Sequence, residues 1–90
     1  MKIHNEITIS GVVQGVGFRF SARNAARIYG ISGYVMNLPD GSVFIEAEGP
    51  EFNINQFIKW CYEGPPSARI ENVSIHESKL KDFKTFEIKL

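Results

Sequence analysis

The chain has 90 residues, and its ten basic and ten acidic side chains give a formal net charge of zero. This length suits one small domain, residues 1–90, which buries roughly 60 to 65% of the surface of its unfolded chain. The charge balance excludes an overall positive field that would hold a nucleic-acid backbone or an anionic membrane surface. The 43% hydrophobic content is that of an ordinary soluble globular protein, so any anion site must be local.

Targeting, membrane-spanning and metal-binding patterns are not evident in the sequence. The longest uncharged apolar run is far below the roughly 20 residues of a membrane span, and the N-terminal residues lack the apolar core of a signal peptide. Cys61 is the single cysteine, which excludes an internal disulfide, and His4 and His76 provide no spaced ligand set for zinc. We therefore expect a cytoplasmic protein that uses no metal.

The first third of the chain predicts a strand, a glycine-rich loop and a helix. Alternating apolar and polar residues predict a strand from Ile3 to Val13 that enters the loop. Apolar residues then recur at helical spacing, Ser21 is a candidate for the helix start, and Gly30 suits the position after its end. The apolar stripe of this helix consists of Phe18, Ala22, Ala25, Ala26 and Tyr29.

A hairpin and a second helix are predicted next. Residues 31–38 form a strand, Leu38 to Gly41 a tight turn, and Ser42 to Glu48 a third strand. A helix follows Pro50 and ends around residues 64–66, Gly-Pro-Pro, because proline cannot continue it. Its apolar stripe consists of Ile54, Phe57, Ile58 and Cys61, which makes the cysteine an inert core thiol.

Two further strands complete the predicted order. Ile70, Val73 and Ile75 mark a fourth strand, whose break in alternation between residues 70 and 73 indicates a bulge. A short extra strand alternates at the C-terminus. The order β-α-β-β-α-β plus one strand predicts an α+β fold, the ferredoxin-like sandwich, with an antiparallel sheet and two helices on one face.

The loop between the first strand and the first helix has the build of an anion cradle. Gly11, Gly15 and Gly17 fall within seven residues, and Arg19 follows them. Glycines let successive backbone N–H groups turn inward around a tetrahedral anion, and a helix that starts after the loop adds its positive end. The guanidinium of Arg19 offers a planar fork that fits two phosphoryl oxygens.

Two segments resemble the signatures of a known family. Residues 14–19, QGVGFR, resemble the first signature of the acylphosphatase family, and residues 33–41, GYVMNLPDG, resemble its second. Residues 64–69, GPPSAR, are similar to a further recurring segment of that family. The resemblance spans essentially the whole chain and agrees with the predicted order of elements.

This resemblance implies a cofactor-free, metal-independent enzyme that hydrolyses acyl phosphates to carboxylate and inorganic phosphate. It implies that Arg19 binds the phosphoryl group and that Asn37 holds the attacking water. The phosphate would be ringed by the backbone amides of the loop and helix start, namely Gly15, Val16, Gly17, Phe18 and Arg19. The expected partners are a small-molecule acyl phosphate and phosphate as a competitive inhibitor, without nucleic acid or membrane, and the expected state is a monomer.

Two other classes of function stay open. The cradle could serve a binding module that captures phosphate, an acyl phosphate or carbamoyl phosphate without turnover. An RNA-binding domain of the same element order would need surface aromatics and clustered basic residues, and neither is evident.

Several charged residues have simpler explanations than chemistry. Asp40 and Gly41 have the composition of a turn, and Arg23 is expected on a solvated helix face. The acidic residues Asp40, Glu46, Glu48 and Glu51 are expected to face solvent.

Overall fold

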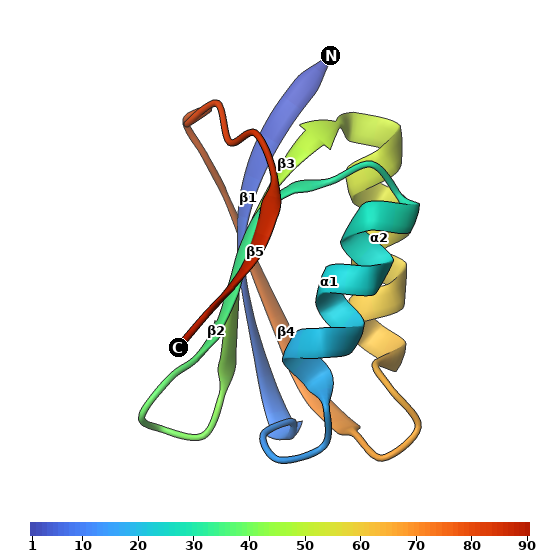
Figure 1. Cartoon of the computed structure of the whole chain (residues 1–90), viewed down its shortest axis with the longest axis vertical. Coiled ribbons are helices and arrows are strands. Elements are labelled where there is room, and N and C mark those ends of the chain that lie inside the picture. The colour runs from blue at the N-terminus through green and yellow to red at the C-terminus, as the bar shows by residue number, and fades with distance from the viewer.

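The computed structural model describes residues 1–90, which form five strands and two helices in the predicted order (Figure 1). The elements are β1 (Lys2–Val12), α1 (Phe18–Ile28), β2 (Ser32–Asn37), β3 (Val43–Pro50), α2 (Glu51–Glu63), β4 (Arg69–Ser78) and β5 (Phe86–Lys89). Each predicted strand and helix is present, with boundaries that shift by up to three residues.

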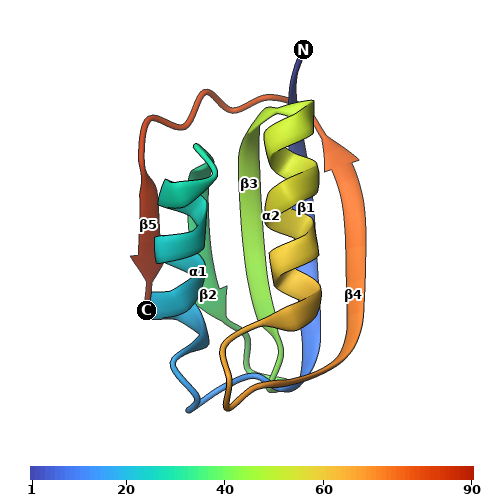
Figure 2. The ribbon, with the colours of Figure 1, turned by 90° about the vertical axis from the view of Figure 1, so that its right-hand side faces the viewer.

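The strands form one sheet in the order β4-β1-β3-β2-β5. Both helices cover the same face of this sheet, which confirms the ferredoxin-like α+β sandwich (Figure 2). The sheet is mixed rather than antiparallel throughout, because β5 pairs in parallel with β2, with Gly33 opposite Phe86. Residues 79–85 make this possible by carrying the chain from β4 at one edge to β5 at the other.

The hydrophobic core lies between the sheet and the helices. On β3, Val43, Ile45 and Ala47 point toward the helices and are fully buried, as the alternation predicts. The helices contribute buried stripes that include Phe18, Ala22, Ala25, Ala26, Ile54, Phe57 and Cys61. The core position of Cys61 is confirmed, and burial raises the pKa of its thiol, so it stays protonated at neutral pH.

The first helix starts earlier than Ser21. It begins at Phe18, and Gly17 precedes it in the left-handed conformation with φ 79°, where no side chain caps the helix. Ser21 lies inside the helix and its amide donates to the carbonyl of Gly17 at 3.0 Å. Gly30, at φ 71°, follows the helix as predicted. Glycine is suited to both ends because it lacks the Cβ that disfavours positive φ.

The predicted bulge in the fourth strand is present. Ser10 pairs with Asn72 while Gly11 pairs with Ile70, so that one residue of β4 has no partner on β1. A Cβ on Gly11 would lie 2.1 Å from the carbonyl oxygen of Arg69. The close approach of the two strands at the bulge therefore requires glycine at position 11, next to the last residue of β1.

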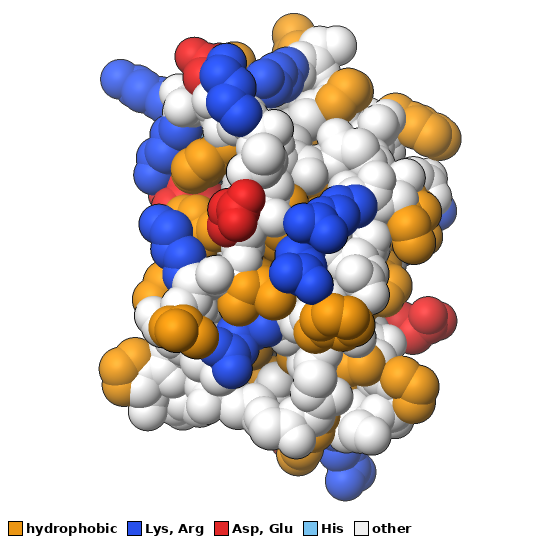
Figure 3. Space-filling view, in the orientation of Figure 1, with side chains coloured by type: hydrophobic (Ala, Val, Ile, Leu, Met, Phe, Trp, Pro, Cys, Tyr) orange, Lys and Arg blue, Asp and Glu red, His pale blue; other side chains and the backbone are white.

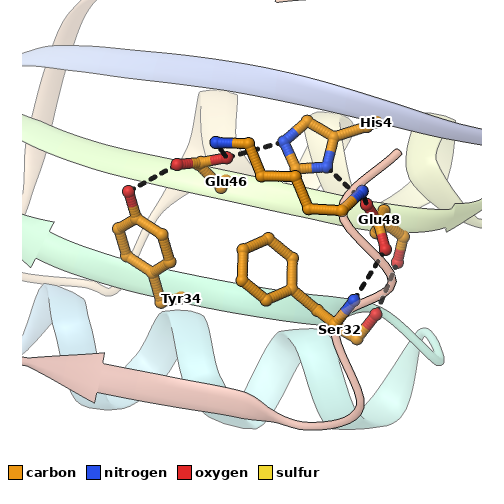
Figure 4. Close-up of polar contacts among 7 residues, drawn as sticks. His4, Ser32, Tyr34, Glu46 and Glu48 are labelled. Carbon is orange, nitrogen blue, oxygen red and sulfur yellow. Dashed lines mark hydrogen bonds and ion pairs between the residues drawn. The ribbon is translucent and has the colours of Figure 1, made fainter. Parts of the chain in front are cut away.

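Two acidic side chains that were expected to face solvent are buried. Glu46 is 6% exposed and Glu48 is fully buried, because residues 79–85 cross the face of the sheet that the helices leave open (Figure 4). The two ring nitrogens of His4 lie 2.8 Å from Glu46 Oε1 and 2.8 Å from Glu48 Oε2. Glu48 also accepts hydrogen bonds from backbone amides of the crossing segment. Asp40 and Glu51 are exposed as expected.

Neither helix has the length and apolar character needed to span a lipid bilayer.

Candidate active site

The loop between β1 and α1 presents backbone amides that have no acceptor within the chain. Gly15 and Gly17 both adopt positive φ, 75° and 79°, a backbone conformation that residues with a Cβ rarely adopt. The amides of residues 15–17 take part in no backbone hydrogen bond of the structure. Because the first amides of α1 also point out of the helix start, this end of the molecule has the donors that an anion needs.

Arg19 lies in the first turn of α1, directly after this loop. The ion pairs of the structure join His4, Glu46, Glu48 and Lys81, and none involves Arg19. Its guanidinium is therefore not neutralised by a carboxylate. Arg19 lines the same hollow as Gly15 and Gly17.

Asn37 ends β2 and faces the same side of the sheet as the buried Val35, two residues before it. Its side-chain oxygen Oδ1 is buried and has no hydrogen-bond partner within the chain. A buried amide oxygen without a partner is uncommon in a folded protein and indicates a place where a ligand or water is bound. The structure places Asn37 beside the loop.

These residues line one cavity of about 240 Å³. They belong to the end of the molecule where β1 leads into α1 and β2 turns into β3, as the ribbon of Figure 1 shows. The lining residues are Val13, Gly15, Gly17, Phe18, Arg19, Phe20, Asn37, Ile88 and Leu90. The structure thus brings together Gly15, Gly17, Phe18, Arg19 and Asn37. Val16 is not among the lining residues, because its side chain packs against the hydrophobic core.

Three apolar side chains of this cavity were missed from the sequence. Phe20, Ile88 and Leu90 form an apolar wall beside the polar groups. Alternation identified the last strand, but only its parallel pairing with β2 brings Ile88 opposite Val35 and near Asn37. A C-terminal strand can join a sheet at either edge, so the sequence pattern gave no signal for this position.

Arg23 lies one turn after Arg19 but does not line the cavity. Its guanidinium carbon sits 5.1 Å from the centre of the Phe20 ring, a cation–π contact, and its Nε is buried without a partner. Figure 3 shows several Lys and Arg side chains on the face that carries α1 and β5, spread from end to end with hydrophobic side chains between them. This spread differs from the continuous basic patch that a nucleic-acid backbone requires.

Asp40 has the turn role that its sequence position suggests. Its carboxylate accepts hydrogen bonds from the hydroxyl of Ser42 at 2.6 Å and from the amide of Ser42 at 3.0 Å. These two bonds, the hydroxyl one first, lower the pKa of the Asp40 carboxyl from its ordinary value of 3.8. The turn is closed further by the amide of Gly41, which donates to the carbonyl of Leu38 at 3.1 Å.

Other groups that commonly carry out catalysis lie away from the cavity. His4 is held between two glutamates on the open face of the sheet, and His76 is exposed on β4. No three His, Cys, Asp or Glu side chains are grouped in a way that could hold a metal ion. The chemistry that this cavity can supply is thus the binding of an anion by backbone amides and one guanidinium, with an amide oxygen beside it.

A family model, curated relatives and solved structures of similar length match this chain under one description. The family model described as Acylphosphatase matches residues 5–88. A protein of Thermotoga maritima named Acylphosphatase is 46% identical over 84 residues, which cover 93% of each chain. The crystal structure of acylphosphatase from Bacillus subtilis superposes with a TM-score of 0.95 at 35% identity, over 98% of this chain and 99% of the other.

One similar structure is part of a much larger protein. Full-length HypF in its phosphate- and nucleotide-bound form matches 99% of this chain at 36% identity with a TM-score of 0.88. The match covers only 12% of HypF. The same fold thus occurs both in chains of this size and as a small part of a larger one.

Proposed function

Because the chain belongs to the acylphosphatase family, we propose that it hydrolyses acyl phosphates to a carboxylate and inorganic phosphate, with residues 1–90 acting as one domain. One observation carries the proposal. A single cavity is lined by the glycine-rich loop, whose amides have no backbone acceptor, and by Arg19, which no carboxylate pairs. Asn37, whose buried Oδ1 has no partner, lines the same cavity.

The phosphoryl group would be bound by the amides of residues 15–19 and by the guanidinium of Arg19. The transition state of phosphoryl transfer is loose, and its negative charge spreads over the equatorial oxygens. Fixed N–H dipoles and one guanidinium aimed at the phosphoryl oxygens would stabilise such charge without rearranging. We propose that these groups supply the positive charge and that no metal ion is required.

Asn37 would position the attacking water. Its unpartnered Oδ1 can accept a hydrogen bond from a water on the side of the phosphorus opposite the leaving carboxylate. Attack in line with the breaking P–O bond then releases the carboxylate and leaves inorganic phosphate in the cradle. Because a carboxylate is a good leaving group, the reaction does not demand a strong general base, which agrees with a cavity that no histidine lines.

Every residue of this machinery belongs to one chain, which supports a monomeric enzyme. The product phosphate would occupy the site of the substrate phosphoryl group, so phosphate is expected to inhibit competitively.

The test is hydrolysis of benzoyl phosphate by the purified protein in excess EDTA. We expect turnover well above the buffer rate, unaffected by the chelator and competitively inhibited by phosphate. Rates equal to buffer with benzoyl, acetyl and carbamoyl phosphate would refute the assignment, and loss of the rate in EDTA would refute metal independence.

A second candidate function is a binding module that holds phosphate or carbamoyl phosphate without turnover. The match to a small part of HypF favours it, because there the fold occurs inside a larger phosphate-bound protein. Titration calorimetry separates the two. Tight phosphate binding without catalysis supports the module, and weak competitive binding together with turnover supports the enzyme.

A further inference from the structure

The carboxamide of Gln14 joins the glycine-rich loop to the turn between β2 and β3. Its Nε2 donates to the carbonyl oxygen of Leu38 at 2.8 Å and to that of Ser42 at 2.9 Å. Both N–H bonds of one amide group are therefore used on two backbone carbonyls of the same turn. No charge is involved, so the contact depends on the geometry of the two segments.

The turn does not need Gln14 to keep its own shape. The amide of Leu38 donates to the carbonyl of Ser42 at 2.9 Å, and Asp40 closes the tip through its bonds to Ser42. The loop is likewise shaped by the positive φ angles of Gly15 and Gly17. What Gln14 adds is a connection between two segments that are each formed locally.

Both ends of this connection lie one residue away from a group of the proposed reaction. Gln14 directly precedes Gly15, the first residue of the phosphate cradle, and Leu38 directly follows Asn37. A shift of the loop relative to the turn would thus move the phosphoryl site relative to the water site. A misplacement of about 1 Å between reacting groups can cost on the order of a hundredfold in rate.

We propose that Gln14 is a positioning residue, which holds the phosphate cradle and Asn37 at the separation needed for in-line attack. This inference rests on the proposed hydrolysis of acyl phosphates. Gln14 acts through the two segments that it ties together and does not itself touch the substrate.

The first test is Gln14→Met, which keeps the length of the side chain but removes both donors. We expect kcat for benzoyl phosphate to fall by roughly tenfold to a hundredfold. We expect the inhibition constant of phosphate to change by less than about threefold, because phosphate is held by the cradle amides and Arg19 without Asn37. An unchanged kcat, or an inhibition constant that rises as much as kcat falls, would overturn the proposal.

The second test asks whether Gln14 acts through Asn37. Asn37→Ala alone is expected to lower kcat by about a hundredfold, as the loss of a preorganised group does. In that background Gln14→Met should have little further effect, since no water-holding group is left to misplace. Equal losses in both backgrounds would show a general loosening of the loop and would contradict a positioning role.

A matched control removes an equivalent bond away from the cavity. Asn53 Nδ2 donates to the carbonyl of Tyr29 at 3.0 Å and joins α2 to the end of α1. Asn53→Leu should lower stability with kcat unchanged. Should Gln14→Met fail to fold, Gln14→Asn retains the amide on a side chain one methylene shorter. A reduced kcat in that variant supports the proposal, and wild-type kcat contradicts it.

The two proposals fail separately. A wild-type protein without acyl phosphate hydrolysis refutes the proposed function. If the wild-type protein hydrolyses acyl phosphates and Gln14→Met has the same kcat, only the proposed role of Gln14 is refuted.

Discussion

At the scale of single residues, the proposed chemistry depends on one side chain, Arg19, that the structure leaves free of any counter-charge. A guanidinium paired with a carboxylate on the surface would add only about 0 to 1 kcal/mol of stability and would be unable to bind a phosphoryl group. Arg19 is in none of the ion pairs, although the chain has as many acidic as basic side chains. Its position at the start of α1 keeps it beside the loop amides, away from the glutamates of β3.

Replacing this side chain should abolish most of the activity. Arg19→Ala is expected to lower kcat/KM for benzoyl phosphate by about a thousandfold or more, as loss of a transition-state arginine does in other phosphoryl transfers. The matched control is Arg27→Ala, which removes an exposed arginine at the other end of the same helix. A similar loss of kcat/KM in both variants would show that activity depends on the overall positive charge of the protein, and it would contradict a specific contact of Arg19 with the phosphoryl group.

At the scale of elements, the junction of loop and α1 depends on a backbone conformation that only glycine adopts readily. Gly17 has φ 79°, and a Cβ built there meets no atom within 4 Å. The cost of a side chain at this position would therefore come from the φ angle itself and not from a clash.

Gly17→Ala, compared with a control glycine, tests whether the backbone conformation of the loop matters for phosphate binding apart from its effect on stability. We expect the free energy of unfolding to fall by roughly 1–2 kcal/mol, the cost of a left-handed conformation. Phosphate inhibition should also weaken, because the strained backbone turns its amides out of the cavity. The control is Gly30→Ala at φ 71°, remote from the cavity, where a Cβ would also lie 3.3 Å from Asn53 Nδ2. It should lose at least as much stability in urea denaturation and keep its phosphate affinity.

At the scale of the whole molecule, a buried polar network ties the crossing segment to the sheet. Glu48 joins His4 on β1 to the backbone amides of residues 81 and 83, while the ammonium group of Lys81 lies 2.8 Å from Glu46 Oε1. Tyr34 donates to Glu46 from β2, and burial followed by this bond raises the pKa of Tyr34 to about 12. The segment held in this way leads directly into β5, which supplies part of the cavity wall.

This network predicts a loss of stability in acid. Burial acts to raise the pKa of Glu48, but hydrogen bonds from the amides of the crossing segment and from His4 outweigh it and hold the pKa below its ordinary value of 4.5. A carboxyl whose pKa is lower in the folded state stabilises the fold above its unfolded-state pKa. That contribution is lost as the pH falls through the folded-state value, so the free energy of unfolding should drop below about pH 4.5.

Urea denaturation between pH 7 and pH 3 checks this expectation. Glu48→Gln should lower stability at pH 7 by about 2 kcal/mol, because it replaces a buried carboxylate that accepts several hydrogen bonds, and it should reduce the dependence of stability on pH in acid. Glu77→Gln, an exposed change on β4, should leave both unchanged. If the free energy of unfolding falls as steeply with decreasing pH in Glu48→Gln as in the wild type, other carboxyl groups cause the loss of stability in acid.

Most of the fold could be predicted from the sequence because its signals are local. The alternation of Val43, Ile45 and Ala47 and the helical spacing of Phe57 and Cys61 each report which face of one element is buried. The prediction failed for Glu46 and Glu48, since a glutamate on the outer face of a strand normally meets solvent. No local pattern shows that a later segment will cover that face.

The sequence by itself determined the glycine-rich loop, the arginine after it and the order of the elements, because backbone freedom and apolar periodicity belong to short stretches of chain. Only the tertiary structure decided that Asn37 lies beside this loop and that Gln14 donates hydrogen bonds to the turn between β2 and β3. It also decided that residues at the C-terminal end of the chain line the cavity. These contacts join residues that are more than 20 positions apart, and they exist only once β1, β2 and β5 have taken their places in one sheet.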